Sequence, residues 1–137
     1  MSEFLDKMKP FVVAEGERTI LCKSYSYRIV RPEFEPRLPG FVGLLEGVLF
    51  ISSDTPAEYR EYIFWHEVMC VDHRKRQGCA QTLKEELERV PKRILRPYIE
   101  YRCACFEALM NFYAAKPPAF YQEIVGSYQY LLKLLED

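Results

Sequence analysis

The chain has 137 residues, of which 49% are hydrophobic and 28% are charged. This composition is that of one ordinary globular domain, and it excludes a wholly disordered protein. The 19 basic and 20 acidic side chains leave a formal net charge of -1. No overall positive field therefore attracts DNA or RNA, and nucleic acid is not an expected partner.

Membrane insertion and secretion are not expected either. The sequence contains no run of roughly 18 to 20 apolar residues that would span a bilayer, and its first residues lack the apolar core of a signal peptide. We therefore expect a cytoplasmic protein without a membrane partner. The five cysteines are then expected to be reduced thiols, with metal ligation as the alternative role.

The first half of the chain has the pattern of strands. Short β-favouring runs cover residues 19–22 and 25–30, and the second run alternates apolar with polar side chains. A proline-rich loop follows. Residues 41–51 predict two more strands joined by a turn at residues 46 and 47, and the apolar run 48–51 predicts a strand in the interior of the sheet.

The second half has the pattern of helices. Thr55 and Glu58 have the spacing of a capping box with Pro56 between them, which predicts a helix that runs to about Arg76 and stops at Gly78. Further helices are expected over residues 82–90, from 97 to about 115, and from the double proline at 117–118 to the C-terminus.

Strands followed by helices, without an internal repeat or a linker, predict an α+β fold. We expect a single domain over residues 1–137, with a small N-terminal antiparallel or mixed sheet and four helices behind it.

The first predicted helix carries a group of possible metal ligands. At 3.6 residues per turn, His66, Cys70 and His73 lie on one stripe of this helix together with Ile63. Imidazole and thiolate are the ligands that zinc prefers. Glu67 is rotated by about 100° from His66, where a carboxylate would contact a metal-bound water without binding the metal.

The segment His66-Glu67-Val68-Met69-Cys70 resembles the His-Glu-x-x-His segment of zincin metallopeptidases, with cysteine at the position of the second histidine. A buried strand followed by the helix with this segment is also similar to the order of elements in small zincin domains. The resemblance covers roughly residues 43 to 90.

The gluzincin branch of that family completes its metal site with a glutamate from the next helix. The matching residue is Glu86, because it shares a stripe with Leu83, Leu87 and Val90 and is therefore expected on the buried face. The resemblance implies zinc held by His66, Cys70 and either Glu86 or His73. Glu67 would take the proton from the zinc-bound water during hydrolysis of an amide bond in a peptide or protein substrate.

Three other interpretations stay open. His66, Cys70, His73 and Glu86 together would close the coordination sphere and make the zinc structural. A scaffold without metal would pair Glu86 with His66 or His73 as a hydrogen bond or ion pair. A non-catalytic interaction module, with a homo-oligomer as one form, would use the tyrosine-rich helices 98–113 and 121–135 as its partner surface.

Overall fold

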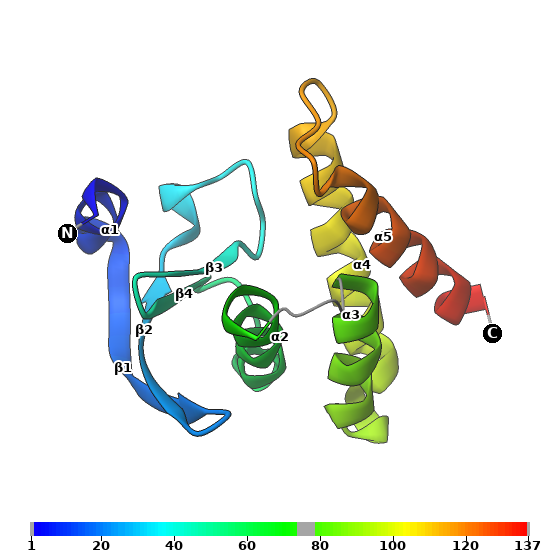
Figure 1. The fold of residues 1–137 in the computed structure, drawn as a ribbon, viewed down its shortest axis with the longest axis horizontal. Helices are drawn as coiled ribbons and strands as arrows, with labels where there is room; N and C mark the ends of the chain where they lie inside the picture. Colours follow the sequence, from blue (N-terminus) through cyan, green and yellow to red (C-terminus); the bar gives the residue numbers. More distant parts are fainter. Residues whose placement is uncertain (1, 74–78, 137) are drawn as a thin grey trace. The chain divides into compact units, whose positions relative to one another are not determined.

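The computed structural model describes residues 2–73 and 79–136. The chain separates into two compact units, residues 1–68 and 69–137. The N-terminal unit contains the strands and the C-terminal unit contains the last three helices (Figure 1). The boundary falls inside α2 (Arg60–Asp72). The expectation of a single domain stays a prediction.

The N-terminal unit is built on a mixed sheet of four strands, which confirms the predicted α+β class. In chain order its elements are α1 (Glu3–Met8), η1 (Lys9–Phe11), β1 (Val12–Ile20), β2 (Lys23–Val30), η2 (Pro32–Phe34), β3 (Val42–Leu45), β4 (Val48–Ser52), η3 (Ala57–Tyr59) and the first part of α2. The strand order is β1-β2-β4-β3; β2 and β4 are parallel and the other two pairs are antiparallel. β4 is therefore an interior strand, as its apolar run predicted.

Two elements of this unit differ from the sequence expectation. β1 begins at Val12 and not at residue 19, because its pairing with β2 extends over the whole hairpin. Its side chains do not alternate between buried and exposed, so hydropathy gave no sign of a strand there. α1 was not predicted, since a six-residue helix is too short to show a helical period.

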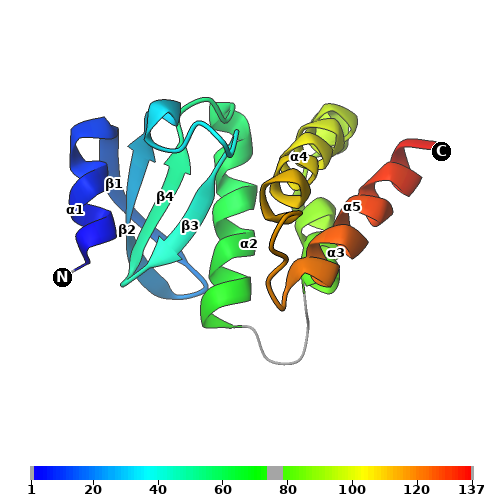
Figure 2. The same cartoon turned by 90° about the horizontal axis from the view of Figure 1, so that it is seen from above.

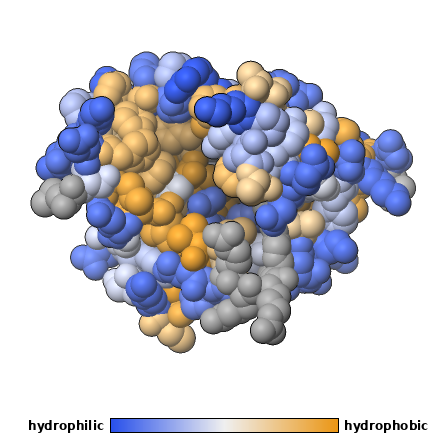
Figure 3. Space-filling view, turned by 45° about the horizontal axis from the view of Figure 1, so that its top comes forward, coloured by the Kyte–Doolittle hydropathy of each residue, from blue (hydrophilic) through white to orange (hydrophobic). Residues whose placement is uncertain are grey.

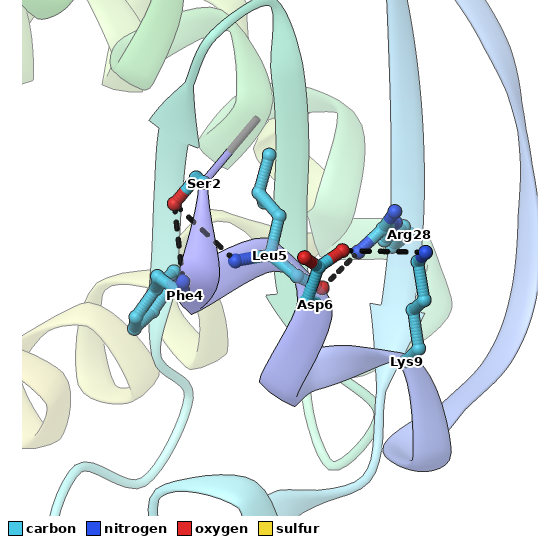
Figure 4. Close-up of polar contacts among 6 residues, drawn as sticks. All are labelled: Ser2, Phe4, Leu5, Asp6, Lys9 and Arg28. Carbon is cyan, nitrogen blue, oxygen red and sulfur yellow. Dashed lines mark hydrogen bonds and ion pairs between the residues drawn. The ribbon is translucent and has the colours of Figure 1, made fainter.

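Side-chain and backbone caps hold α1 together, although an isolated helix of this length would be unstable. The hydroxyl of Ser2 accepts hydrogen bonds from the amides of Phe4 at 3.1 Å and Leu5 at 3.4 Å (Figure 4). From β2, the guanidinium of Arg28 donates to the carbonyl of Leu5 at 2.8 Å. Both ends of the helix therefore have partners for backbone groups that the helix itself leaves unbonded.

The sheet has a helix on each face (Figure 2). On one face, α1 contributes to an apolar cluster; its buried members are Leu5, Met8, Val30, Phe41 and Phe50. On the opposite face, the ring of Phe64 in α2 lies 6.0 Å from the ring of Tyr27 in β2, measured between centroids. An apolar area reaches the surface on the side where α1 and the loop after β2 lie (Figure 3).

Two-residue turns close both hairpins of the sheet. Glu46 and Gly47 have positive φ angles of 51° and 78°, which confirms the turn expected at these residues. Leu21 and Cys22 also have positive φ angles, 52° and 66°. Neither is glycine, asparagine or aspartate, so this second turn carries no sequence signal of its type.

The C-terminal unit consists of the end of α2, α3 (Cys79–Arg89), α4 (Lys92–Tyr113) and α5 (Tyr121–Glu136). α3 and α4 begin earlier than predicted. α4 includes Pro97, which costs this helix one backbone hydrogen bond near its start but does not prevent the preceding turn. With α1, the described residues form five helices instead of four.

The start of α2 also differs from the prediction. Pro56 is extended, with a ψ of 135°, and helical conformation begins at Ala57 as a 3-10 turn. Arg60 fixes this entry by donating to the carbonyl of Thr55 at 3.1 Å. The predicted helix end at Arg76 and the stop at Gly78 lie outside the described residues. Among the helices in the described ranges, none has the length and apolar character needed to cross a membrane.

Candidate functional site

The predicted ligands on α2 differ in their burial. His66 is 5% exposed, whereas Glu67 and Cys70 are half-buried. His73 follows the last residue of the helix, and its amide donates to the carbonyl of Met69 at 3.2 Å. This is the hydrogen bond of a helical turn, so the backbone keeps its helical path as far as His73.

Burial of α2 is not limited to the predicted stripe. Ile63, Phe64, Trp65 and His66 are consecutive and all buried. Phe64 packs against the sheet through Tyr27. Because side chains that face several directions are covered, burial of His66 alone does not distinguish a ligand from a residue of the core.

Glu86, the ligand expected from the next helix, is completely buried in α3. Leu83, Leu87 and Val90 are also buried, which confirms the predicted stripe. The guanidinium of Arg102 in α4 donates from Nε to Oε2 of Glu86 at 2.9 Å and from Nη2 to Oε1 at 3.0 Å. The hydroxyl of Tyr98 also donates to Oε2. We call these three side chains the Glu86 cluster.

The charges of the Glu86 cluster compensate one another inside the helical unit. Arg102 is 5% exposed, and burial by itself acts to lower the pKa of its guanidinium. The interactions with Glu86, Tyr98 and Cys105 together outweigh this effect and raise that pKa, so Arg102 stays charged. Burial and the charge of Glu86 both raise the pKa of Tyr98 well above its usual range. Tyr98 therefore remains a protonated donor.

This geometry is that of a bidentate arginine–carboxylate pair with a third donor. Both carboxylate oxygens of Glu86 already accept charge-assisted or hydroxyl hydrogen bonds within its own unit. The cluster positions α3 against α4, and in this state its carboxylate is bound to protein donors.

Sequence reasoning missed Arg102 and Tyr98. A signal was available, because Arg102 lies between Ile99 and Phe106 on the apolar stripe of α4, and a charge in such a position requires a partner. Tyr98 is one helical turn before Arg102 and points toward the same region. The spacing alone does not reveal which acidic residue the pair would meet.

The five residues singled out from the sequence belong to two units. His66 and Glu67 are in the N-terminal unit, whereas Cys70, His73 and Glu86 are in the C-terminal unit. Across residues 2–73 and 79–136, no three or more histidine, cysteine, aspartate or glutamate side chains gather as a metal site requires. Zinc binding by this set stays a prediction.

Comparison of the chain with family models, curated proteins and solved structures gives no match. Function is therefore inferred from the residues themselves and from the contacts that they make.

Proposed function

We propose that this protein is a non-catalytic interaction module, in which the Glu86 cluster is a structural element of the helical unit. The observation that carries this proposal is the engagement of both Glu86 oxygens by Arg102 and Tyr98. A carboxylate that balances a buried guanidinium is a poor candidate for a third zinc ligand, because a metal would have to displace that guanidinium.

The free energy needed to replace Arg102 by a metal as the partner of Glu86 supports the structural role. Removing one partner of a buried ion pair typically costs about 3–5 kcal/mol, since the other charge is left without compensation. If Glu86 turned to a metal, Arg102 would be that uncompensated charge at 5% exposure. Cys70 adds a second argument: a thiolate ligand makes zinc a weaker Lewis acid than imidazole does, which disfavours hydrolysis.

A zinc-dependent hydrolase remains the second candidate, in the form that does not use Glu86. The observation in its favour is the helical hydrogen bond from His73 to Met69 at 3.2 Å, which continues the backbone path of α2 to His73. His66, Cys70 and His73 would then bind zinc, and Glu67 would be the general base.

The zinc content of the full chain, purified without chelator, separates the two candidates. For an interaction module we expect well below one zinc per chain and the same melting temperature with and without added zinc. We also expect no cleavage of an unstructured protein such as casein. Near-stoichiometric zinc that is lost in Cys70→Ala but kept in Cys22→Ala would contradict the proposal. Cys22 is an exposed thiol in another part of the chain, so it is the matched control.

Cleavage of casein by the parent chain that disappears in Glu67→Gln, with zinc content unchanged, would establish catalysis. Glu58→Gln is the control, because it makes the same change at an exposed residue of the same unit.

A further inference from the structure

β1 is a long strand with an open edge. It has nine residues and forms the outer edge of the sheet (Figure 1). In the described part of the chain, β2 is its only partner strand. Residues 13–19 are exposed apart from half-buried Gly16, and Val13 is 56% exposed. An edge of this length presents unpaired backbone groups to which another strand can bind.

The β1–β2 hairpin shows which backbone groups face outward. A two-residue turn joins Ile20 to Lys23, and in such a hairpin these flanking residues form a hydrogen-bonded pair. Alternate pairs along an antiparallel ladder are bonded in the same way. On β1, therefore, the even-numbered residues 14 to 20 bond to β2, while Glu15, Glu17 and Thr19 direct their N–H and C=O groups to solvent.

Two hydrogen bonds at the end of β2 agree with this alternation. The amide of Arg31 donates to the carbonyl of Phe11 at 2.8 Å, just before β1. The carbonyl of Val30 accepts from the amide of Ser53 at 2.7 Å, just after β4. Odd-numbered residues of β2 therefore face β1 and even-numbered ones face β4, as the register at the turn requires.

Two of the three charged side chains of β1 belong to outward-bonding residues, Glu15 and Glu17, and the third is Arg18. Glu15 and Glu17 are opposite Arg28 and Ser26 of β2, so both carboxylates are on the same face of the sheet. Side chains directly opposite each other on neighbouring strands are about 5 Å apart at their Cβ atoms. A strand that adds to β1 would place two of its side chains next to these carboxylates, and basic side chains fit best.

A second copy of the chain does not satisfy this requirement. In an antiparallel pair of β1 strands, outward-bonding residues must face each other. Registers centred on Glu15 or Glu17 place that glutamate opposite its own copy, and the register centred on Gly16 places Glu15 opposite Glu17. Like charges directly opposite one another destabilise a strand pair. Charge repulsion therefore disfavours these three self-paired registers, whereas a strand with basic side chains can pair with the edge.

We propose that the β1 edge binds an extended segment of a partner protein by strand addition, with lysine or arginine at alternate positions of that segment facing Glu15 and Glu17. This inference names the partner class of the interaction module and so rests on the proposed function. Main-chain hydrogen bonds to Glu15, Glu17 and Thr19 supply affinity for any extended segment. The two carboxylates make binding selective for segments with basic side chains.

The test uses the full chain labelled with nitrogen-15 and a synthetic peptide, acetyl-Thr-Glu-Lys-Val-Lys-Val-Thr-amide. Paired antiparallel with β1, its lysines face Glu17 and Glu15 and its glutamate faces Arg18. We expect the peptide to shift the amide resonances of Glu15, Glu17 and Thr19 and to slow their exchange with solvent. A peptide of the same composition, acetyl-Thr-Lys-Lys-Val-Glu-Val-Thr-amide, cannot place both lysines opposite the carboxylates and is expected to bind about fivefold more weakly.

Two variants separate the charge from the backbone contribution. Glu15→Gln combined with Glu17→Gln is expected to weaken binding about tenfold, because two favourable cross-strand pairs are lost. Glu58→Gln with Glu61→Gln makes the same charge change at exposed residues away from the sheet and should leave binding unchanged. Thr19→Pro keeps both carboxylates, removes one outward N–H and is expected to weaken binding at least fivefold.

The inference is overturned if the peptide leaves the β1 amides unchanged at saturating concentration, or if its binding is indifferent to Glu15→Gln with Glu17→Gln. It is also overturned if sedimentation shows a dimer that Thr19→Pro dissociates, since a second copy then occupies the edge. If the chain is zinc-free and inactive but does not bind the peptide, only the proposal of strand addition at the β1 edge is rejected. Zinc-dependent hydrolysis would instead reject the proposed function.

Discussion

The two units of the chain differ in the interactions that make their core packing specific. In the N-terminal unit the buried side chains are mainly apolar and aromatic, and the packing is specific because side chains and backbone fit closely together. In the C-terminal unit three polar side chains are buried together, and specificity comes from charge compensation. Substitutions that disturb the close packing of the N-terminal unit or the charge balance of the C-terminal unit should therefore change stability by different amounts.

Close approach of glycine to an aromatic ring defines the N-terminal unit. Gly43 in β3 is paired with Phe50 in β4, and Gly16 in β1 is paired with Tyr27 in β2. A Cβ atom at Gly43 would overlap with Cζ of Phe50 and approach its Cε1 to 2.9 Å; at Gly16 it would approach the Tyr27 hydroxyl to 2.9 Å. In both pairs the ring occupies the space that a side chain would fill.

The helical unit instead depends on one carboxylate. Glu86 is in contact with Arg102 and Tyr98, which are separated from it by 16 and 12 positions in the sequence. A buried pair of this kind does not necessarily add net stability relative to apolar residues, but it disfavours arrangements that separate the charges. Three predictions test this contrast between the units.

The largest effect is expected for Arg102→Met. It leaves the Glu86 carboxylate buried without its counter-charge, and we expect the free energy of opening α3 and α4 to fall by about 3–5 kcal/mol. Hydrogen exchange measured on peptides from these helices reports that free energy. Peptides from β2 and β4 provide the internal reference for the other unit.

A triple variant is the control for this loss. Glu86→Leu, Tyr98→Phe and Arg102→Met together remove all three polar groups, and we expect most of the lost free energy to return, because no charge or hydroxyl is left unsatisfied. If the triple variant is as unstable as the single one, packing volume and not charge is the basis of the helical core.

An intermediate effect is expected for Gly43→Ala. Phe50 is 9% exposed and packs against Phe4 and Phe41, so its ring has little room to move. We expect a loss of about 1–3 kcal/mol in the unfolding free energy of the N-terminal unit, measured by hydrogen exchange in β4.

Gly16→Ala is the matched comparison in the same sheet. Tyr27 is only half-buried and its hydroxyl end can move aside, so the loss should be smaller than at Gly43. Equal losses at the two positions would mean that the intrinsic strand preference of alanine, and not contact with the ring, determines the cost.

The smallest effect appears only at high pH. An unfolded tyrosine has a pKa of about 10, whereas burial and Glu86 raise the pKa of Tyr98 in the folded chain. Below pH 10 both states hold the proton and stability is unaffected. Above it the unfolded state loses the proton first, so the free energy of opening the helical unit should fall by about 1.4 kcal/mol per pH unit.

Tyr98→Phe should remove this contribution to the alkaline slope. Tyr121→Phe is the control, because it makes the same change at a tyrosine of the same unit that is only half-buried. The measurement is hydrogen exchange corrected for the pH dependence of the chemical exchange rate, between pH 9 and about 11. Identical slopes for the parent chain and Tyr98→Phe would show that Tyr98 ionises as easily in the folded chain as in the unfolded one.

Features that depend on neighbouring residues in the chain were predictable from the sequence. The apolar run 48–51 indicated the interior position of β4, and the helical stripe through Leu83 and Val90 indicated the burial of Glu86. Glycine at position 47 indicated a turn, because this residue type adopts a positive φ at little cost. In each case the spacing of apolar residues or the residue type is sufficient to indicate the local structure.

Tertiary contacts determined the rest. β1 is a strand along its full length because β2 pairs with it, and the Leu21–Cys22 turn adopts positive φ angles because both strands require it. The partners of Glu86 come from a different helix. A helical stripe can show that a carboxylate is buried. Which side chain compensates its charge depends on the neighbouring helix that packs against it. That is why the sequence indicated that Glu86 is buried but did not indicate that Arg102 and Tyr98 are its partners.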